Sequence, residues 1–297
     1  MTQFIFGETI QSEKVSKPDP GLYIVATPIG NLRDVTLRAL DILRAADVIA
    51  CEDTRITGRL LKAYGIEAAS IPYHDHNAAR ARPGLIKRLE RGEIVALVSD
   101  AGTPLVSDPG FKLVEACAKS GIAVYAVPGA SALLAGLGVA GLPTDRFYFA
   151  GFLPSKQAAR RKALREIAAV PGTLVIYESA RRLAASLADM AAVLGDRRAS
   201  VARELTKRFE EVVRGSLTKL ATRYAESGPP KGEIVVIVAP PDPPEIGEEM
   251  IDRALTAALE RQSVKDAAGD VAAALGLPRR RLYERALALS GKRGPAK

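Results

Sequence analysis

Three short turns carry the residues of this sequence that are best suited to bind a small molecule. Ser99–Pro104 (SDAGTP) directly follows the apolar run Ile94–Val98, and its Asp100 supplies a carboxylate that can accept hydrogen bonds from amine or hydroxyl groups. The glycine in this turn allows a ligand to approach the backbone closely. The turns at 27–31 (TPIGN) and 128–132 (PGASA) follow two further apolar runs.

The position of these turns predicts a binding pocket. In open α/β sheets, ligands bind outside the carboxyl ends of the strands. If the three apolar runs are neighbouring parallel strands, their turns converge on one edge of the sheet. A single turn of this kind is more typical of a plain connection, so the prediction depends on all three.

Other motifs give less support to specific chemistry. The sequence has no GxGxxG or GxxxxGK[ST] pattern, and Ser131 lacks the closing glycine of a nucleophile elbow. A dehydrogenase or a hydrolase is therefore unsupported. His74 and His76, the two histidines of the chain, flank Asp75 and leave open a metal site or a polar loop. We favour the loop, because successive side chains of an extended segment point to opposite sides, and we expect no metal.

The elements that position these turns are those of an α/β protein. Short apolar runs alternate with helical periods, which is typical of α/β units with mostly parallel sheets. We expect strands at 22–26, 48–50, 94–98, 122–127, 147–150, 174–177, 200–204, 211–215 and 233–239. We expect helices near 34–46, 54–63, 77–91, 109–120, 156–169, 179–194, 216–226, 246–261, 264–275 and 279–289. Ser107–Pro109 is a strong helix start, with a capping side chain before a proline.

The length of the chain and its proline-rich segment indicate where its domains begin and end. At about 150 residues per domain, 297 residues predict about two domains. After a polar leader at 1–20, we place an N-terminal α/β domain at 21–143 and a C-terminal α/β domain at 144–240. A proline-rich linker (APPDPP) then leads to a basic helical extension at 246–297, whose last two helices resemble a helix-turn-helix pair.

Composition excludes several classes of protein. A 47% apolar and 26% charged chain is typical of a globular protein and excludes general disorder. Cys51 and Cys117 are isolated and fit a reducing cytosol, so we expect a cytoplasmic protein; the first residues lack the features of a signal peptide. Ser120–Thr144 is uncharged and long enough to span a bilayer. Its glycines and prolines favour a strand, a turn and a small-residue helix inside the protein.

The net charge of +8 is concentrated in two segments. Residues 156–165 hold five basic side chains without an acid, and residues 261–297 hold nine basic against three acidic side chains. Such patches favour a polyanion partner, although solvated helix faces of an arginine-rich chain are the alternative. The candidate RNA contacts are Arg160, Arg161, Arg279, Arg280 and Arg281. RNA's deep groove does not admit a helix, so the tail arginines are expected to contact phosphates that position the RNA. A dimer-stabilising or solubilising tail is the other interpretation of the extension.

Seven blocks of the sequence resemble, in order, those of a known family. They are Gly21–Leu37 (GLYIVATPIGNLRDVTL), Glu52–Arg55 (EDTR), Tyr73–Asn77 (YHDHN), Leu97–Gly110 (LVSDAGTPLVSDPG), Gly151–Pro154 (GFLP), Tyr177–Ser179 (YES) and Arg203–Lys207 (RELTK). The family is the branch of the tetrapyrrole methylase (class III) superfamily that methylates ribose in ribosomal RNA. The resemblance covers about 21–240 and, weakly, the basic tail. Ala180–Arg181 replaces a usual Pro-His, and Gly129–Ser131 is often Gly-Pro-Ser in that family.

The resemblance implies a cofactor, a substrate and an assembly. S-adenosylmethionine would lie between the two α/β domains of each subunit of a homodimer. The implied cofactor residues are Pro28, Asp100, Thr103, Ser131 and Ala132 from the first domain and Tyr177 and Ala202 from the second. The implied substrate is the ribose 2′-OH of cytidine 1402 in 16S ribosomal RNA, within the small subunit or a late precursor.

A ribose hydroxyl is a poor nucleophile and needs a base or an orienting acceptor. The candidates for this role are Glu204, Lys207 and Asp53, each of which has an alternative structural role; Glu204 would pair with a neighbouring cation. Two other functions remain open at this point. One is a corrinoid or other tetrapyrrole methylase, which would not need a basic tail. The other is a non-catalytic RNA-binding factor of ribosome assembly.

Overall fold

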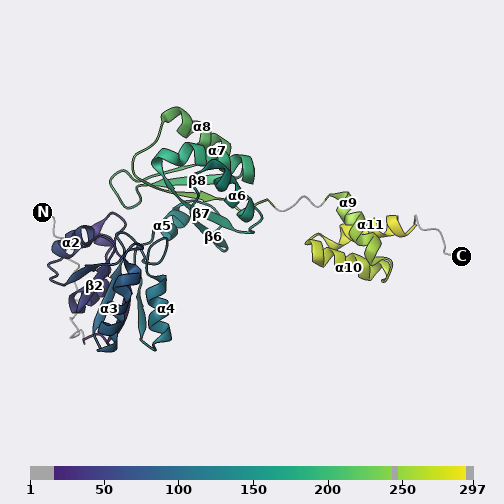
Figure 1. Ribbon diagram of the computed structural model, residues 1–297. Helices are drawn as coiled ribbons and strands as arrows, with labels where there is room; N and C mark the ends of the chain where they lie inside the picture. The colour runs from purple at the N-terminus through teal and green to yellow at the C-terminus, as the bar shows by residue number, and fades with distance from the viewer. Residues whose placement is uncertain (1–16, 243–246, 292–297) are drawn as a thin grey trace, which may run out of the picture. The chain divides into compact units, whose positions relative to one another are not determined.

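The computed structural model describes residues 17–242 and 247–291, which belong to two compact units divided after Pro241. The larger unit contains two five-stranded sheets, and the smaller unit contains three helices (Figure 1). The α/β fold class with a helical extension is therefore confirmed. Most of the predicted leader, and Pro243 and Pro244 of the predicted linker, lie outside the described residues.

The first sheet is entirely parallel. Its strands are β1 (Gly21–Val25), β2 (Val48–Cys51), β3 (Ser70–Pro72), β4 (Ile94–Val98) and β5 (Val124–Val127), in the order β3-β2-β4-β1-β5. The helices that follow these strands are α1 (Leu37–Ala45), after the short turn η1 (Leu32–Asp34), and α2 (Thr54–Ala63), α3 (Ala78–Glu90), α4 (Phe111–Lys119) and α5 (Ala132–Val139). Because all the strands run the same way, the turns after β1, β4 and β5 meet at one edge of this sheet.

The second sheet is mixed, so the expectation of mostly parallel pairing is wrong for it. Its strands are β6 (Phe147–Phe152), β7 (Thr173–Ser179), β8 (Arg198–Arg203), β9 (Glu211–Ser216) and β10 (Glu233–Val238), in the order β6-β7-β10-β8-β9. Only β6 and β7 pair in parallel. A parallel pair needs a long crossover, whereas β8 and β9 are joined by the short segment 204–210. The helices are α6 (Gln157–Ile167), α7 (Leu183–Leu194), after the turn η2 (Ala180–Arg182), and α8 (Leu217–Ser227).

Helix α5 joins the two sheets. Leu133 and Leu137 on this helix share one apolar core with Val175 of β7 and with Val235 and Ile237 of β10. A Cβ at Gly136 of α5 would lie 3.0 Å from a methyl carbon of Val235, so a small residue is needed for this close contact. The core therefore fixes the carboxyl edge of the first sheet against the second sheet.

The loop after β4 differs from the predicted helix start. Gly110 is the N-cap of α4, which begins at Phe111 and not at Pro109. Leu105 and Ser107 adopt positive φ values of 75° and 65°. Leu105 folds back so that its side chain lies against Gly110, where a Cβ would be 2.7 Å from it. This packing draws residues 105–109 into an irregular loop at the sheet edge.

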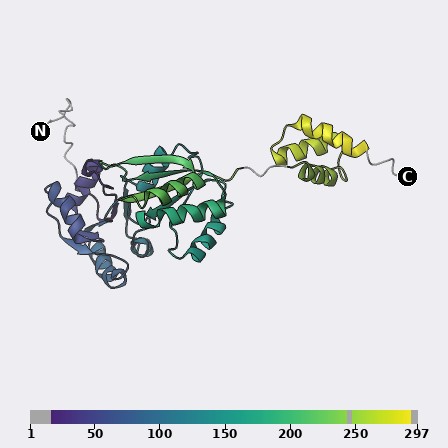
Figure 2. The same ribbon diagram turned by 90° about the horizontal axis from the view of Figure 1, so that it is seen from above.

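The smaller unit consists of α9 (Glu248–Ala258), α10 (Val264–Leu275) and α11 (Arg279–Gly291), which pack on one another (Figure 2). Its core is built from residues of all three helices, among them Leu255, Val271 and Leu282. The Ser263 side chain caps the start of α10, and Gly276 ends this helix in the left-handed conformation. The three predicted helices are confirmed.

The uncharged segment Ser120–Thr144 folds as β5, a turn and α5, as expected. Among the helices that the structure describes, none has the length and apolar character needed to cross a membrane.

Candidate active site

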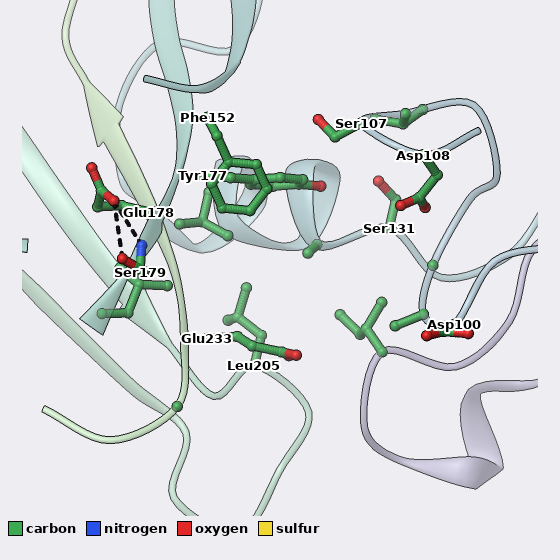
Figure 3. A pocket seen from close by; sticks show the side chains of 18 of the residues that line it. Asp100, Ser107, Asp108, Ser131, Phe152, Tyr177, Glu178, Ser179, Leu205 and Glu233 are labelled. Carbon is green, nitrogen blue, oxygen red and sulfur yellow. Dashed lines mark hydrogen bonds between the residues drawn. The ribbon is translucent and has the colours of Figure 1, made fainter. Parts of the chain in front are cut away.

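The larger of two adjoining cavities lies where the carboxyl edge of the first sheet faces the second sheet (Figure 3). Its volume is about 430 Å³. The loop after β4, the start of α5, the end of β7 and the start of β10 form its walls. A cavity of this size suits a ligand of drug-like dimensions.

The three predicted turns do meet at this cavity. Thr27 and Gly102 exchange two backbone hydrogen bonds, of 2.8 and 3.0 Å, which pair the turn after β1 with the turn after β4. The hydroxyl of Thr103 donates to the carbonyl of Ala130 at 3.2 Å, which adds the turn after β5. The pocket edge is therefore held together by bonds between turns that lie far apart in the sequence.

Tyr177 forms the wall on the side of the second sheet. Its hydroxyl accepts a hydrogen bond of 3.1 Å from the backbone N–H of Leu133, in the first turn of α5. Its ring packs edge-on against Phe149 and Phe152. Burial raises the pKa of Tyr177, so the phenol stays neutral and the wall is apolar with one hydroxyl.

Carboxylates line the opposite wall. Asp100 accepts a hydrogen bond of 2.9 Å from the backbone N–H of Asp53. Burial raises the pKa of Asp100, and the charge of Asp53 adds to this effect. Burial likewise raises the pKa of Asp108 and of the nearby Glu52, each with a contribution from the Asp100 charge. A positively charged ligand group would relieve this mutual repulsion.

The predicted cofactor residues separate into three groups. The larger cavity is lined by Asp100, Thr103, Ser131, Ala132 and Tyr177. Pro28 instead lines the second, smaller cavity. Ala202 is fully buried and does not line the larger cavity, although Val235, its partner on β10, does. Sequence reasoning missed Val106, Phe152 and Leu205, whose apolar side chains complete the larger cavity; Phe152 lies within the GFLP block, which was a signal for it.

Lys207 and Glu204, two of the predicted catalytic residues, form one ion pair. The Lys207 Nζ lies 2.8 Å from Glu204 Oε1 and 2.9 Å from Glu233 Oε2. Burial alone would lower the pKa of Lys207, but the hydrogen bonds to the two glutamates raise it overall. The same bond from Lys207 lowers the pKa of Glu204. Lys207 is thus a hydrogen-bond donor at neutral pH, and Glu204 is a weak base.

Asp53, the third predicted catalytic residue, caps α2. Its carboxylate accepts from the backbone N–H of Arg55 at 2.8 Å and pairs with the guanidinium of the same residue. These bonds lower the pKa of Asp53 to about 2. A carboxylate with so low a pKa is a weak base at neutral pH. Its backbone N–H supports Asp100, which gives Asp53 a structural role at the site.

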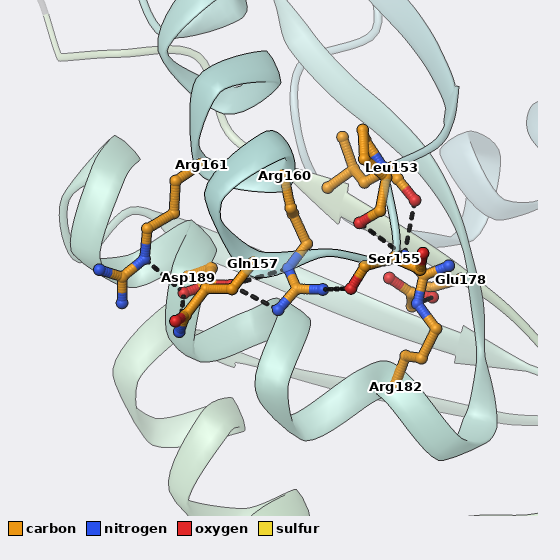
Figure 4. A network of polar contacts seen from close by, with 9 residues as sticks. Leu153, Ser155, Gln157, Arg160, Arg161, Glu178, Arg182 and Asp189 are labelled. Atoms are coloured by element: carbon orange, nitrogen blue, oxygen red, sulfur yellow. Dashed lines mark hydrogen bonds and ion pairs between the residues drawn. The ribbon is translucent and has the colours of Figure 1, made fainter.

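The prediction that Arg160 contacts RNA is wrong, because its side chain is buried (Figure 4). Arg160 is only 4% exposed, and its Nε donates to Asp189 Oδ2 at 2.7 Å. Arg161 bonds the other oxygen of the same carboxylate at 2.6 Å, with its side chain 42% exposed. The first basic cluster thus includes a structural arginine that holds α6 to α7.

The tail arginines are exposed, and two of them have partners on their own unit. Arg279 donates to the carbonyl of Lys265 at 3.3 Å, and Arg280 pairs with Glu284 at 3.1 Å. Arg281 lines a small groove on α9 and α11. Lys292, Arg293 and Lys297 lie outside the described residues.

His74 and His76 do not form part of a metal site in the described residues, where no group of three or more His, Cys, Asp or Glu could hold an ion. The polar segment 74–77 instead leads into α3: Asn77 Oδ1 accepts from the backbone N–H of His74 at 2.9 Å.

The sequence of this chain matches two known family profiles and is similar to proteins of known name. The sequence profile of the tetrapyrrole (corrin/porphyrin) methylases matches residues 21–221, and that of the RsmI C-terminal HTH domain matches residues 244–290. The chain is 50% identical to ribosomal RNA small subunit methyltransferase I of Mesorhizobium japonicum, over 96% of this chain and 97% of that protein. It is 47% identical to the protein of that name from Pseudomonas aeruginosa, over 91% and 98%.

The fold also matches a solved structure. Uroporphyrin-III C-methyl transferase from Thermus thermophilus, complexed with S-adenyl homocysteine, superposes with a TM-score of 0.51 at 22% identity, over 73% of this chain and 96% of that one. At this identity the likeness concerns the fold.

Proposed function

The chain belongs to the tetrapyrrole (corrin/porphyrin) methylases, in the branch of the ribosomal RNA small subunit methyltransferases I, and from this membership we propose that it methylates small-subunit ribosomal RNA. The methyl donor is S-adenosylmethionine, and the acceptor is the ribose 2′-OH of cytidine 1402 in 16S RNA. The observation that carries the proposal is the 430 Å³ cavity built from the SDAGTP loop, the start of α5 and Tyr177, in a chain about half identical to enzymes of that name.

The residues of the larger cavity fit S-adenosylmethionine. The sulfonium and amino groups of the cofactor are cationic, and Asp100 and Asp108 carry carboxylates with raised pKa values that such charges would stabilise as anions. Tyr177, Phe152 and Val106 give an apolar surface for the adenosine part. When bound, the cofactor supplies an electrophilic methyl group.

The protein's own contribution to the reaction is mainly positioning. A sulfonium loses its charge on methyl transfer, so the site does not need to stabilise a strong new charge. Holding the hydroxyl in line behind the methyl carbon therefore provides most of the acceleration. Asp53 and Glu204 are poor acceptors for the hydroxyl proton, because hydrogen bonds from Arg55 and Lys207 lower their pKa values. Lys207 is assigned an orienting role as a donor.

We assign the basic extension to docking on ribosomal RNA in the cytoplasm, through the phosphates. A corrinoid or tetrapyrrole methylase is disfavoured, because curated relatives at 44–50% identity carry the ribosomal RNA name. A non-catalytic assembly factor is disfavoured by the complete cavity with its aspartates.

We also propose that the protein is a homodimer. Exposed apolar side chains occur on three consecutive elements: Val124 on β5, Leu134 on α5, and Phe147 and Tyr148 on β6. Strands β5 and β6 are each at the edge of a sheet. Unpaired edges with apolar side chains are surfaces that proteins usually cover, and a second copy of the chain would cover them symmetrically.

The dimer predicts a clear result in light scattering. Leu134→Asp places a charge in the proposed interface and should shift the protein from dimer to monomer at micromolar concentration. Leu37→Asp, at a side chain of similar exposure on α1, is the control and should leave the mass unchanged. A wild-type mass of one chain would contradict the dimer.

The decisive experiment for the function is a map of ribose methylation in 16S RNA from cells with and without the protein, repeated with purified protein and small subunits. We expect one 2′-O-methyl group, at cytidine 1402, that depends on the protein. Calorimetry of Asp100→Ala should show weaker S-adenosylmethionine binding. Unchanged affinity would remove Asp100 from the cofactor site.

A further inference from the structure

The second cavity adjoins the proposed cofactor site. Its volume is about 270 Å³, and it shares four wall residues with the larger cavity: Ile29, Asp100, Ala101 and Glu233. A methyl acceptor must lie within about 3–3.5 Å of the methyl group, in line with the bond that breaks. An acceptor cavity must therefore share a wall with the donor cavity, as this one does.

The lining of the second cavity differs in character from that of the first. Apolar side chains form one side, where Leu32 is 47% and Ile56 is 40% exposed, with Leu60 buried behind them. Isolated bases that are taken out of a strand are commonly held against aromatic or apolar side chains. Exposed leucine and isoleucine at a cavity mouth suit the face of such a base.

Two cations belong to the same cavity. Lys207 reaches it from the β8–β9 connection, and Arg59 reaches it from α2. The neighbouring Arg55 is held by Asp53. Arg59, by contrast, is exposed and its side chain forms no ion pair or hydrogen bond with the residues that the structure describes. Its guanidinium is therefore available to a phosphate from solution.

We propose that the second cavity receives the target nucleotide of the RNA, extruded from its strand, with its base against Ile56 and an adjacent phosphate on Arg59. This inference rests on the proposed function, because it assigns the acceptor side of that reaction. It adds a binding step: the bond that forms is still from the methyl carbon to the ribose oxygen, the bond that breaks is still from that carbon to sulfur, and the hydroxyl proton leaves to an acceptor. Pro28, in the floor of this cavity, then contacts the acceptor rather than the cofactor.

The first test compares two arginines on the same domain. Arg59→Ala should raise the KM for RNA about tenfold, as expected for the loss of one phosphate contact of about 1.4 kcal/mol, and should leave S-adenosylmethionine affinity unchanged. The slope of log affinity for RNA against log salt should fall by about 0.7, the value for one phosphate of a single strand. Arg91→Ala is the matched control, since Arg91 lies between α3 and β4 at the amino edge of the sheet.

The second test fills the cavity. Ile56→Trp adds bulk at a half-exposed position, so the fold is expected to tolerate it, and methyl transfer should fall at least a hundredfold with cofactor affinity retained. Lys87→Trp, on an exposed position of α3, is the control for added bulk. If Arg59→Ala and Ile56→Trp both stay within twofold of their controls, the assignment of this cavity is wrong.

Failure of the proposed function gives a different result. If the wild-type protein transfers no methyl group to 16S RNA, the proposed function fails, and binding of cytidine 5′-monophosphate in the presence of S-adenosylhomocysteine then decides the inference. Binding that is lost in Ile56→Trp and weakened in Arg59→Ala would support the nucleotide cavity. No binding by the wild-type protein would overturn it.

Discussion

The ionised form of Asp100 is destabilised by its surroundings in the folded protein. Burial and the neighbouring Asp53 charge raise its pKa, so the folded protein binds a proton at this carboxyl more tightly than the unfolded chain does. The protonated form is thus favoured by folding, and the ionised form destabilises the fold. Proteins commonly keep such groups at sites where a ligand needs them.

This gives a prediction with a definite sign. As pH rises from the unfolded pKa through the raised folded pKa, Asp100 makes a growing unfavourable contribution to stability, which is complete above the folded pKa. Asp100→Asn keeps an oxygen that can accept from the Asp53 N–H and removes the charge. We therefore expect a higher Tm at pH 7, little change at pH 3, and weaker S-adenosylmethionine binding, all measurable by thermal unfolding and calorimetry.

Asp196 provides the opposite control. Asp196 lies between α7 and β8, and backbone and side-chain hydrogen bonds from Thr218, in the first turn of α8, lower its pKa. Its ionised form stabilises the fold above the unfolded pKa, so Asp196→Asn should lower Tm at pH 7. A loss of stability in Asp100→Asn, as in Asp196→Asn, would contradict the electrostatic account of Asp100.

At the scale of elements, one carboxylate connects two helices of the second domain. Asp189 of α7 is 1% exposed and bonds Arg160, Arg161 and Gln157, all near the start of α6 (Figure 4). Arg160 also donates to the carbonyl of Ser155, which holds the chain just before the helix. The network compensates the desolvation of a buried pair and sets how α6 lies on α7.

We expect Asp189→Ala to destabilise the protein by about 3–5 kcal/mol, because it leaves the Arg160 charge buried without a partner. Arg161→Ala removes only the half-exposed partner of Asp189 and should lower the free energy of unfolding by about 1 kcal/mol or less. Chemical denaturation measures both. The double variant Arg160→Met with Asp189→Leu should recover most of the stability; if Asp189→Ala alone is nearly neutral, the buried pair does not hold the helices.

The same network has a pH dependence. Burial alone would raise the pKa of Asp189, but the bonds from Arg161, Arg160 and Gln157 lower it overall. Its stabilising contribution is therefore present above the unfolded pKa and is lost as pH falls through the lowered folded pKa.

The sequence predicts the elements of this protein better than their pairing. Continuous apolar runs such as Ile94–Val98 are buried on both faces and could be located within a residue or two. Strand β3 was missed, because Ser70–Pro72 is short and partly exposed. The antiparallel pairs of the second sheet could not be predicted, because apolar runs do not specify the direction of their neighbours.

The site was predictable where it depends on local sequence. The turns that carry Asp100 and Ser131 were recognised from their position after strands, and the structure brings them together. Arg160 could not be separated from Arg161 by type or spacing, since the difference lies in Asp189, 29 positions away. The ion pair between Lys207 and Glu233 crosses a similar distance in the chain and gave no local signal.

At the scale of the whole molecule, the two compact units predict separable binding functions. Truncation after Pro241 should leave S-adenosylmethionine affinity within about twofold, because every residue of the larger cavity precedes that point. Truncation should weaken RNA binding and make the dependence of RNA affinity on log salt shallower, because the contacts between the tail and the RNA phosphates are lost. Filter binding over a salt series checks this. An unchanged slope would place the RNA contacts elsewhere, with 156–165 as the next segment to test.

Gly30 and Lys207 come from different sheets of the larger unit, and the Lys207 stem occupies the space that a side chain at position 30 would need. A Cβ on Gly30 would lie 2.5 Å from Lys207 Cγ. In evolutionary terms, the two positions are constrained together: a side chain at position 30 needs a shorter residue at position 207, and it also meets the strain of a backbone φ of 156°. A lineage that changes position 30 while Lys207 is retained should therefore pass through poorly active intermediates.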